Sequence, residues 1–453
     1  MASINAAIRQ VKDDVTQWLT PTRVTQSCAA ADYQWRRRVL TPWVTMHLFV
    51  LQVLWGNIAC RGVRHLSHLT FTASAYCAAR MRLPVDVFGC IAASLTHEAR
   101  QQTHDFGRWK GHRVLQTDGS GLSMSDEPAL QQAFGQPAGQ KPGCGFPVMA
   151  VLWLFDAATG LLVDFITDQC YTHDMKHASK LHASMEEGDV LVADCAFASF
   201  AHLALLLQDK LHGVFRMHQR QIVDFTPGRK HRRQRPKAQR KGAPTSRWIK
   251  KLGKLDQLVT YVKPSEKPAW MSEQDYEQLP DEIVVRELRY RIERPGFRTR
   301  QVTLVTTLLD PERYPAHELA ELYRARWQVE TNLKHLKQTM HLNVLRSKTV
   351  EGVRKELWVY LIVYNQVRLL MGAAAERQGV TPDCISFIDA LDAWCHRGWR
   401  GAQGVTLVVY RHRHNRDARH EPRVIKRRKD CYTYMTKPRE ALRKALGITK
   451  VAA

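Results

Sequence analysis

From the start of the chain to about residue 105, apolar residues recur in amphipathic stretches with few strand signals. The pattern breaks at three steps that end in proline, namely Thr20-Pro21, Thr41-Pro42 and Leu83-Pro84. Polar residues interrupt the most apolar run, residues 40–60, so its purely apolar pieces are too short to cross about 30 Å of hydrocarbon. The pattern therefore predicts an all-helical N-terminal region that contains a buried core helix.

Strand-like patterns begin at about residue 111. Residues 112–121 predict a short strand that ends in an Asp-Gly turn, and residues 146–167 predict a hairpin of two apolar runs. Residues 188–194 read as a buried strand, followed by a helix over 199–210 and another strand over 213–219. Three strands followed by alternating helix and strand indicate a mixed α/β fold.

A basic segment then interrupts this plan. Residues 229–254 contain twelve Lys or Arg and no acid, broken by Pro and Gly, which is typical of a mobile loop. Alternating apolar positions over 284–293 and 299–310 add two strands, so a β-rich insertion is expected here. One continuous helix is predicted over 316–340 and a buried apolar helix over 351–377.

The charge of the whole chain narrows the classes of partner. The 453 residues include 67 Lys and Arg against 43 Asp and Glu, a net charge of +24. Such a field favours a polyanion, most often nucleic acid, with an anionic membrane surface as the weaker alternative. The start of the chain lacks the pattern of a secretory signal. The ten cysteines form no CxxC pair, which fits reduced thiols in cytosol.

Four polar residues in the predicted helix 316–340 raise a question of chemistry. Tyr323, Arg326, Glu330 and Lys337 fall within about 60° of one another around a helix, so they form one stripe. A solvated helix face is one explanation, in which Glu330 pairs with Arg326 or with Lys334. The stripe alone does not decide between structure and function.

Two acids elsewhere favour the functional alternative. Asp118 and Asp194 each end a predicted strand, and the ends of two strands together with a helix can bring them to Glu330. Three carboxylates are an oxygen site for hard cations such as Mg²⁺. A pair of such ions activates a hydroxyl and stabilises the leaving oxygen in phosphodiester chemistry. A strongly basic protein with this site is a candidate DNA-cutting enzyme.

The segments TDGSG and VLVADCAFASF, with the spacing Y-x2-R-x3-E-x6-K, resemble the bacterial insertion-sequence transposases of the DDE class. The branch is insertion sequence type four, which carries the YREK signature. The resemblance implies an RNase H-like catalytic core interrupted by the β-rich insertion, with Asp118, Asp194 and Glu330 as the catalytic, metal-binding triad. It implies that Tyr323, Arg326 and Lys337 face DNA phosphates. Two Mg²⁺ ions are the implied cofactor, with Mn²⁺ as a substitute.

The same resemblance implies how the protein works and where. It would bind the terminal inverted repeats of its element, pair two ends as a homodimer on DNA, cut them and join the 3′-hydroxyl ends to target DNA, in the bacterial cytoplasm at the nucleoid. The layout it implies has a helical DNA-binding domain (1–105), two core parts (106–220 and 311–377) around the basic loop and insertion (221–310), and a basic C-terminal segment (378–453). An RNase H-like endonuclease without strand transfer and a catalytically silent DNA-binding descendant are the alternatives.

Some positions stay open on sequence alone. Cys195 stands where this family often has Arg, and the sequence indicates no His partner that would make it a nucleophile. Arg36, Arg37 and Arg38 either contact phosphate or end a solvated helix. Trp248 and Trp270 lie in the region where this family accepts a flipped base, although a core or surface role is favoured for each. The basic tail, with His412, His414 and His420, is expected to face phosphate rather than hold a metal.

Overall fold

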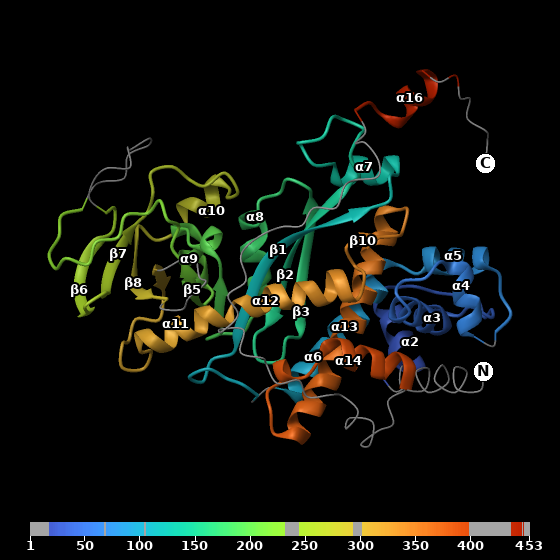
Figure 1. Ribbon diagram of the computed structural model, residues 1–453, viewed down its shortest axis with the longest axis horizontal. Helices are drawn as coiled ribbons and strands as arrows, with labels where there is room; N and C mark the ends of the chain where they lie inside the picture. Colours follow the sequence, from blue (N-terminus) through green and yellow to red (C-terminus); the bar gives the residue numbers. More distant parts are fainter. Residues whose placement is uncertain are drawn as a thin grey trace.

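One ten-stranded mixed sheet runs through the molecule and carries helices on both faces (Figure 1). The computed structural model describes residues 18–67, 69–103, 106–231, 244–292, 301–397, 436–445 and 447. The predicted mixed α/β class is confirmed. The strands are β1 (Val114–Met124), β2 (Val148–Asp156), β3 (Leu162–Gln169), β4 (Val190–Ala193), β5 (His212–Arg216), β6 (Arg247–Gly253), β7 (Asp256–Val262), β8 (Glu282–Arg291), β9 (Gln301–Thr306) and β10 (Val344–Leu345).

The sheet has the order β3-β2-β1-β4-β5-β9-β8-β7-β6, and β10 pairs with the far end of β1. The first three strands form an antiparallel meander, whereas β1, β4 and β5 are parallel neighbours. The helical segments α8 (Met175–Ala178) and η2 (Ser179–Ser184) lie on the way from β3 to β4, and α9 (Phe200–Gln208) connects β4 to β5. Parallel neighbours need such crossovers.

The strands of the predicted insertion extend the same sheet. β9 pairs antiparallel with β5, and β8, β7 and β6 follow outward, with the short helix α10 (Glu273–Glu277) before β8. The prediction of a loop throughout 229–254 is wrong at its end, because β6 is a strand. Pairing with β7 overrides the basic composition there, and Lys250 and Lys251 stay exposed on the outermost strand, as is common at sheet edges. The remainder of that basic segment includes residues 232–243, which lie outside the described residues.

The N-terminal region is helical, as predicted. Its helices are α2 (Pro21–Ala30), α3 (Pro42–Leu54), α4 (Cys60–Val63), η1 (Arg64–Leu66), α5 (Ala73–Arg82) and α6 (Val85–Gln102). Thr20 and Thr41 cap α2 and α3, with Pro as the first helical residue of each, which explains why the sequence breaks there. α3 is the buried core helix that the apolar run predicted.

The remaining helices follow the sheet's last strands. They are α11 (Ala316–Ala325), α12 (Trp327–Lys334), the π-helical turn η4 (His335–Thr339), α13 (Val350–Gln378), η5 (Pro382–Cys384), α14 (Phe387–Asp392), the π-helical turn η6 (Ala393–Arg397) and α16 (Arg439–Ala445); α7 (Pro128–Phe134) precedes β2. α13 is the predicted apolar helix. It is long and apolar enough to cross a membrane by length and composition, but 72% of its apolar window is buried inside the protein, as in a core helix.

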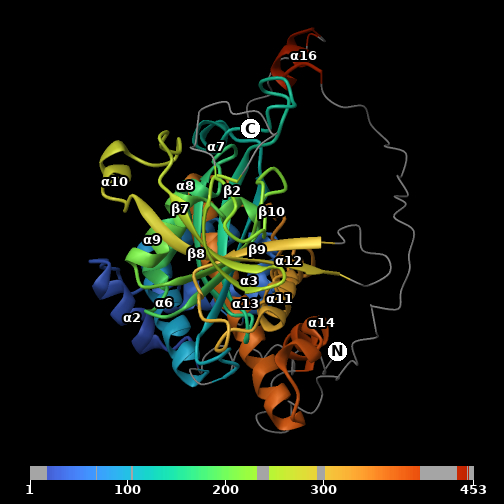
Figure 2. The same cartoon turned by 90° about the vertical axis from the view of Figure 1, so that its left-hand side faces the viewer.

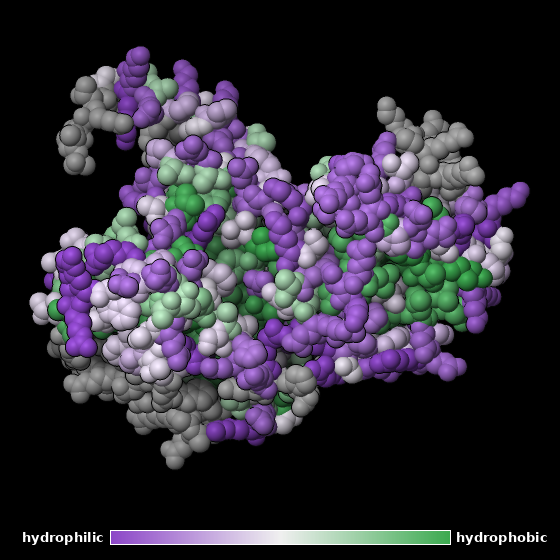
Figure 3. All heavy atoms as spheres, turned by 180° about the vertical axis from the view of Figure 1, so that it is seen from behind, coloured by the Kyte–Doolittle hydropathy of each residue, from purple (hydrophilic) through white to green (hydrophobic). Residues whose placement is uncertain are grey.

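Three apolar clusters hold these layers together. One joins α2, α3 and α6 to β1, β2, β3, α12 and α13. A second lies under α9 and α10, and a third packs α11 against β1, β4 and β5. Figure 2 shows α8, α9 and α10 on one side of the sheet and α11 and α12 on the other. From behind, hydrophilic side chains cover most of the surface, and apolar ones show over the β-rich part (Figure 3).

Candidate active site

Asp118 and Asp194 are neighbours because of the register of two parallel strands. In β1 and β4, Gln116 lies beside Val192, so two residues further along each chain Asp118 comes beside Asp194 on the same face. The sequence predicted that the first strand ends at Asp118, and this is wrong. β1 continues to Met124 and pairs with β2 throughout, so the Asp-Gly step is strand and not turn.

Gly119 is a glycine because another side chain occupies the space of its missing Cβ. An ideal Cβ at Gly119 would lie 2.4 Å from Oδ1 of Asp174, which enters from the segment before α8. Residues 118 and 119 point to opposite faces of the strand, so Asp174 lies behind the sheet from Asp118. The step that suggested a turn therefore reflects close approach of a carboxylate to the backbone.

The Asp194 carboxylate is held by the turn that it begins. β4 ends at Ala193, and Asp194 caps the short helix η3 (Cys195–Phe197) by accepting from the backbone N–H of Ala196 at 2.8 Å. The sequence prediction that a buried strand ends at this acid is correct. Its carboxylate thus lies just beyond the end of β4, beside the part of β1 that carries Asp118.

The third acid lies on a helix that is broken, where the sequence predicted one helix over 316–340. α11 ends at Ala325 and α12 begins at Trp327, with Arg326 between them. Gln116 of β1 donates to the carbonyl oxygen of Ala325 at 3.1 Å, so the break is tied to the strand that carries Asp118. Beyond α12 the chain widens into the π-helical turn η4, which contains Lys337; such turns are often found at functional sites.

Electrostatics shows that the three acids share one environment. The pKa of Asp118 is raised to about 6, chiefly by burial and also by the charges of Asp194 and Glu330, while the Arg326 guanidinium and the Gly119 N–H act in the opposite direction. Arg326 donates to Glu330 at 3.2 Å. This is the pair that was expected if the stripe were only a solvated helix face. The positive charge of Arg326 also interacts with the carboxylate of Asp118 on β1. The pair of Arg326 and Glu330 is therefore electrostatically connected to Asp118.

The donor set suits a hard divalent cation, since it consists of carboxylate oxygens, and two of these acids add their charges to the effect of burial on the pKa of the third, Asp118. Among the residues that the structure describes, no three His, Cys, Asp or Glu side chains converge closely enough to hold an ion as they stand. Glu330 instead bonds Arg326. The acids therefore fit a metal by chemistry and neighbourhood, with Glu330 engaged by Arg326.

The remaining residues of the stripe make contacts within the protein. Tyr323 is buried in the cluster under α11, and burial raises the pKa of its hydroxyl. The Arg326 guanidinium lies 5.9 Å from the centre of the Tyr323 ring. Lys337 donates to the carbonyl oxygen of Gly121 at 3.0 Å, so it reaches back to β1, and burial lowers the pKa of its ammonium. All four side chains therefore face the strand that carries Asp118 or the layer beneath it.

Sequence reasoning missed Arg216, the last residue of β5. Its positive charge acts on Tyr323, on Tyr290 of β8 and on Cys195. The signal was present, because Arg216 ends the strand next to the one that leads to Asp194. Burial and then the charge of Asp194 raise the pKa of the Cys195 thiol, which disfavours a thiolate.

Other candidate residues lie apart from this cluster. Arg36, Arg37 and Arg38 are exposed in the extended segment between α2 and α3, and not at a helix end. Trp248 lies on β6, and Trp270 packs against the core under α9 and α10, in keeping with the favoured structural role. The tail histidines, His412, His414 and His420, lie outside the described residues.

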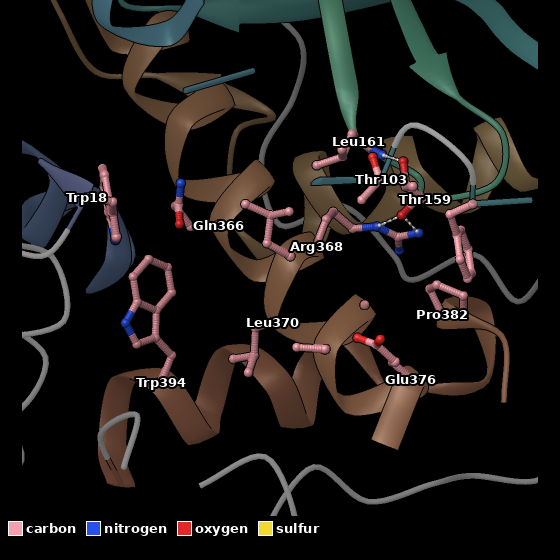
Figure 4. Close-up of a pocket in the computed structure, with 14 residues that line it drawn as sticks. Trp18, Thr103, Thr159, Leu161, Gln366, Arg368, Leu370, Glu376, Pro382 and Trp394 are labelled. Atoms are coloured by element: carbon pink, nitrogen blue, oxygen red, sulfur yellow. Dashed lines mark hydrogen bonds between the residues drawn. The ribbon is translucent and has the colours of Figure 1, made fainter. Parts of the chain in front are cut away.

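A cavity of about 490 Å³ lies elsewhere, among α13, the end of α6, the turn between β2 and β3, and η6 (Figure 4). Trp18 and Trp394 line one side of it. Arg368 of α13 donates from Nε and Nη2 to the carbonyl oxygen of Thr159, at 2.9 and 2.7 Å, and so fastens the β2–β3 turn to the helix. This guanidinium has a structural task.

Comparisons with known proteins bear on the cluster of acids. Residues 109–366 match the family model of the transposase DDE domain, a stretch that includes Asp118, Asp194 and Glu330. The chain is 28% identical over 324 residues to the transposase InsG for insertion sequence element IS4 of Escherichia coli (strain K12). That match covers 70% of this chain and 65% of the relative, so it spans less than two thirds of the relative's length.

Two more distant likenesses were found. The transposase for insertion sequence element IS421 of Escherichia coli is 39% identical over 57 residues, which is 13% of this chain and 15% of that one. A piggyBac transposase synaptic complex with hairpin DNA aligns over 98% of this chain and 89% of its own at 10% identity, with a TM-score of 0.36, too low to carry an argument. The family model alone spans more than half of the 453 residues, so the chain belongs to the family of transposases with a DDE domain, as the YREK resemblance predicted.

Proposed function

We propose that this protein is a transposase that cuts the ends of its own insertion element and joins the freed 3′-hydroxyl ends to target DNA. The observation that carries the proposal is that the charges of Asp194, just after β4, and Glu330 on α12 both act on Asp118 of β1. Acids on or just after two neighbouring parallel strands, with a third on a helix, concentrate negative charge that a fold does not need. A divalent cation would balance it.

We further propose that β1 to β5 with α11 to α13 form an RNase H-like core. The order β3-β2-β1-β4-β5, with an antiparallel meander and then parallel strands, supports this. β6 to β9 would be the insertion, since they enter the sheet between β5 and α11 in sequence. The division into parts at residues 105, 220, 310 and 377 remains a prediction.

In this proposal Asp118, Asp194 and Glu330 hold Mg²⁺, or Mn²⁺ in its place. When bound, a pair of such ions would activate a hydroxyl and stabilise the leaving oxygen in phosphodiester cleavage. Glu330 would exchange its bond with Arg326 for the cation, and this frees the guanidinium for a phosphate. Arg326 can hold phosphate through two parallel bonds, whereas Lys337 acts as a point charge. Tyr323 can donate one hydrogen bond.

The charge of the chain supports DNA as the partner. A net charge of +24 gives salt-sensitive affinity for phosphate that is independent of sequence. Recognition of the terminal inverted repeats is proposed for the N-terminal helices, where Arg36, Arg37 and Arg38 are exposed. A homodimer would pair the two ends of the element, and the site of action would be the bacterial nucleoid.

The test is a cleavage and strand-transfer assay with labelled DNA that carries the inverted repeats flanking the gene, in Mg²⁺. Glu330→Gln should lose nicking and joining by at least about a hundredfold while it still binds the ends, because the amide keeps the shape and removes a ligand charge. Glu321→Gln, an exposed acid on α11, is the matched control and should cut normally.

The alternatives give different results in the same assay. Nicking without joined product would identify an endonuclease that does not transfer strands. Binding of the ends without nicking in Mg²⁺ or Mn²⁺, by wild type and variant alike, would identify a catalytically silent descendant and overturn the proposal.

A further inference from the structure

Behind the sheet, a chain of contacts leads from solvent to the turn that carries Asp194. The half-exposed Asp209 lies with Oδ2 2.6 Å from Nδ1 of His182, which is in η2. Nε2 of His182 is 3.3 Å from Nε2 of His202, which is in α9. Nδ1 of His202 is 2.9 Å from the carbonyl oxygen of Phe197, the last residue of η3. The two ring planes are inclined by only 23°, and the ring centres are 5.4 Å apart, as expected when the two Nε2 atoms face each other edge to edge.

The three contacts between Asp209 and Phe197 need one hydrogen more than two neutral histidines supply. Each of the three contacts requires one hydrogen between its two atoms. The Phe197 carbonyl supplies none, and neither does an ionised Asp209. Two neutral imidazoles carry one hydrogen each. With two hydrogens for three contacts, one buried contact sets lone pair against lone pair, and a third hydrogen completes the chain.

The third hydrogen belongs on His182. His202 is completely buried and packs against the ring of Phe215, and burial lowers the pKa of its imidazole to about 3, so it is neutral. His182 faces the Asp209 carboxylate, which can stabilise an imidazolium. Then both nitrogens of His182 donate, Nε2 of His202 accepts and its Nδ1 donates to Phe197. Every contact has its hydrogen.

This series of hydrogen bonds ends at Phe197, three residues after Asp194, the acid that the proposed function places at the cation. Phe197 closes η3, and Asp194 opens it by accepting from the N–H of Ala196. We propose that His202 and His182 are positioning residues, which fix the Asp194 turn when His182 carries a second proton and loosen it when that proton leaves. The inference rests on the proposed function for the role of Asp194, and on geometry for the proton.

The direction of the pH dependence follows from the groups around His182. Burial lowers its pKa below the usual value, and the bond to Asp209 and its charge oppose this; His202, which stays neutral, is the other ring that faces it. The series of hydrogen bonds from Asp209 to Phe197 therefore has all its hydrogens at pH values below neutrality and lacks one at higher pH. Removal of the Asp209 charge narrows the range in which the turn is fixed.

The proton is tested by ¹⁵N NMR of the full-length protein labelled at histidine, from about pH 5 to about pH 8. His182 should change from two N–H groups to one over this range, while His202 keeps a single hydrogen on Nδ1. Asp209→Asn should move the midpoint of His182 down by about one pH unit. Asp168→Asn is the matched control, because Asp168 also lies 2.6 Å from a buried histidine, His177, outside this chain. A midpoint that Asp209→Asn leaves unchanged, or a His182 with one hydrogen throughout, overturns the inference.

The positioning role is tested by the rate of nicking at saturating DNA and Mg²⁺ over the same range. The rate of Asp209→Asn relative to wild type should fall several-fold between the two midpoints and return to one outside them, while that of Asp168→Asn stays flat. A flat ratio for Asp209→Asn refutes positioning. If wild type nicks at no pH, the proposed function fails instead, and the NMR result still decides the proton.

Discussion

At the scale of the residue, the ionised carboxylate of Asp118 that the proposed chemistry needs is also unfavourable for folding. Its carboxylate is largely withdrawn from water on β1, beside two other acids, and this raises its pKa to about 6. In the unfolded chain it would ionise near the ordinary value for Asp, so the folded state holds its proton more tightly. Stability is therefore lost as pH rises from about 4 through 6, and the cost persists above that range.

Asp118→Asn should therefore stabilise the protein where the wild-type acid is ionised. We expect the free energy of unfolding to rise by about 1–3 kcal/mol at pH 8 without divalent cations, and to be unchanged near pH 4. Urea unfolding at the two pH values measures this. Asp126→Asn, at an exposed loop position, should give no gain at either pH. Equal stabilisation at both values would refute the electrostatic explanation.

At the scale of the element, the sequence predicted which elements exist better than where they break. Period-two and helical patterns gave the hairpin β2–β3, the strand before Asp194 and the core helices, because burial alone sets those patterns. The break at Arg326 depends on a bond between Gln116 and Ala325, and the course of β1 through Gly119 depends on Asp174. Contacts between residues so far apart leave no local signal.

The candidate site divides in the same way. The three acids were proposed from residue type and position, and the charges of Asp194 and Glu330 act on Asp118, but their convergence on one ion stays a prediction. That Tyr323 and Lys337 face β1 and the layer beneath it, rather than solvent, could not be found, since helical angles do not say what lies opposite. Arg216 was missed because the available signal, its place at the end of the strand after Asp194, is shared by many arginines without a role in a site.

A buried ion pair joins β7 to β8, and one of its partners also bonds the segment before α11. Arg286 is fully buried and donates from Nε and Nη2 to both oxygens of Asp256, and from Nη1 to the carbonyl oxygen of Tyr314 just before α11. Arg286→Met should cost about 3–5 kcal/mol of unfolding free energy, because Asp256 is left as an unpaired buried charge.

Urea unfolding measures the cost, with Arg291→Met on the exposed end of the same strand as the control, expected within about 0.5 kcal/mol of wild type. The double variant with Asp256→Leu should recover most of the loss. Failure to recover would show that shape, and not the unpaired charge, is responsible.

At the scale of the whole molecule, the N-terminal helices share a core with the sheet and α13. A network of buried hydrogen bonds stabilises the contact between these helices and α13. The buried Glu356 of α13 accepts from Asn57 at 2.6 Å and from the backbone N–H groups of Arg346 and Ser347. Movement of these helices relative to the sheet would expose both apolar surface and this carboxylate.

Glu356→Ala should weaken that junction by roughly 3 kcal/mol or more, since several buried donors lose their acceptor. Hydrogen exchange measured by mass spectrometry should show α3 and α13 less protected together, while β7 and β8 change little. Glu376→Ala, exposed at the end of the same helix, is the control and should leave protection unchanged. Loss of protection in α3 alone would contradict a shared core.

The place of the three acids in the chain also sets when activity can arise during synthesis. Asp118 and Asp194 leave the ribosome early, but Glu330 follows only after the whole of β6 to β9 has been translated. In the proposed function, a nascent chain or a product of premature termination before α12 therefore carries two acids and cuts nothing. In that proposal, nicking would be confined to chains long enough to include α12.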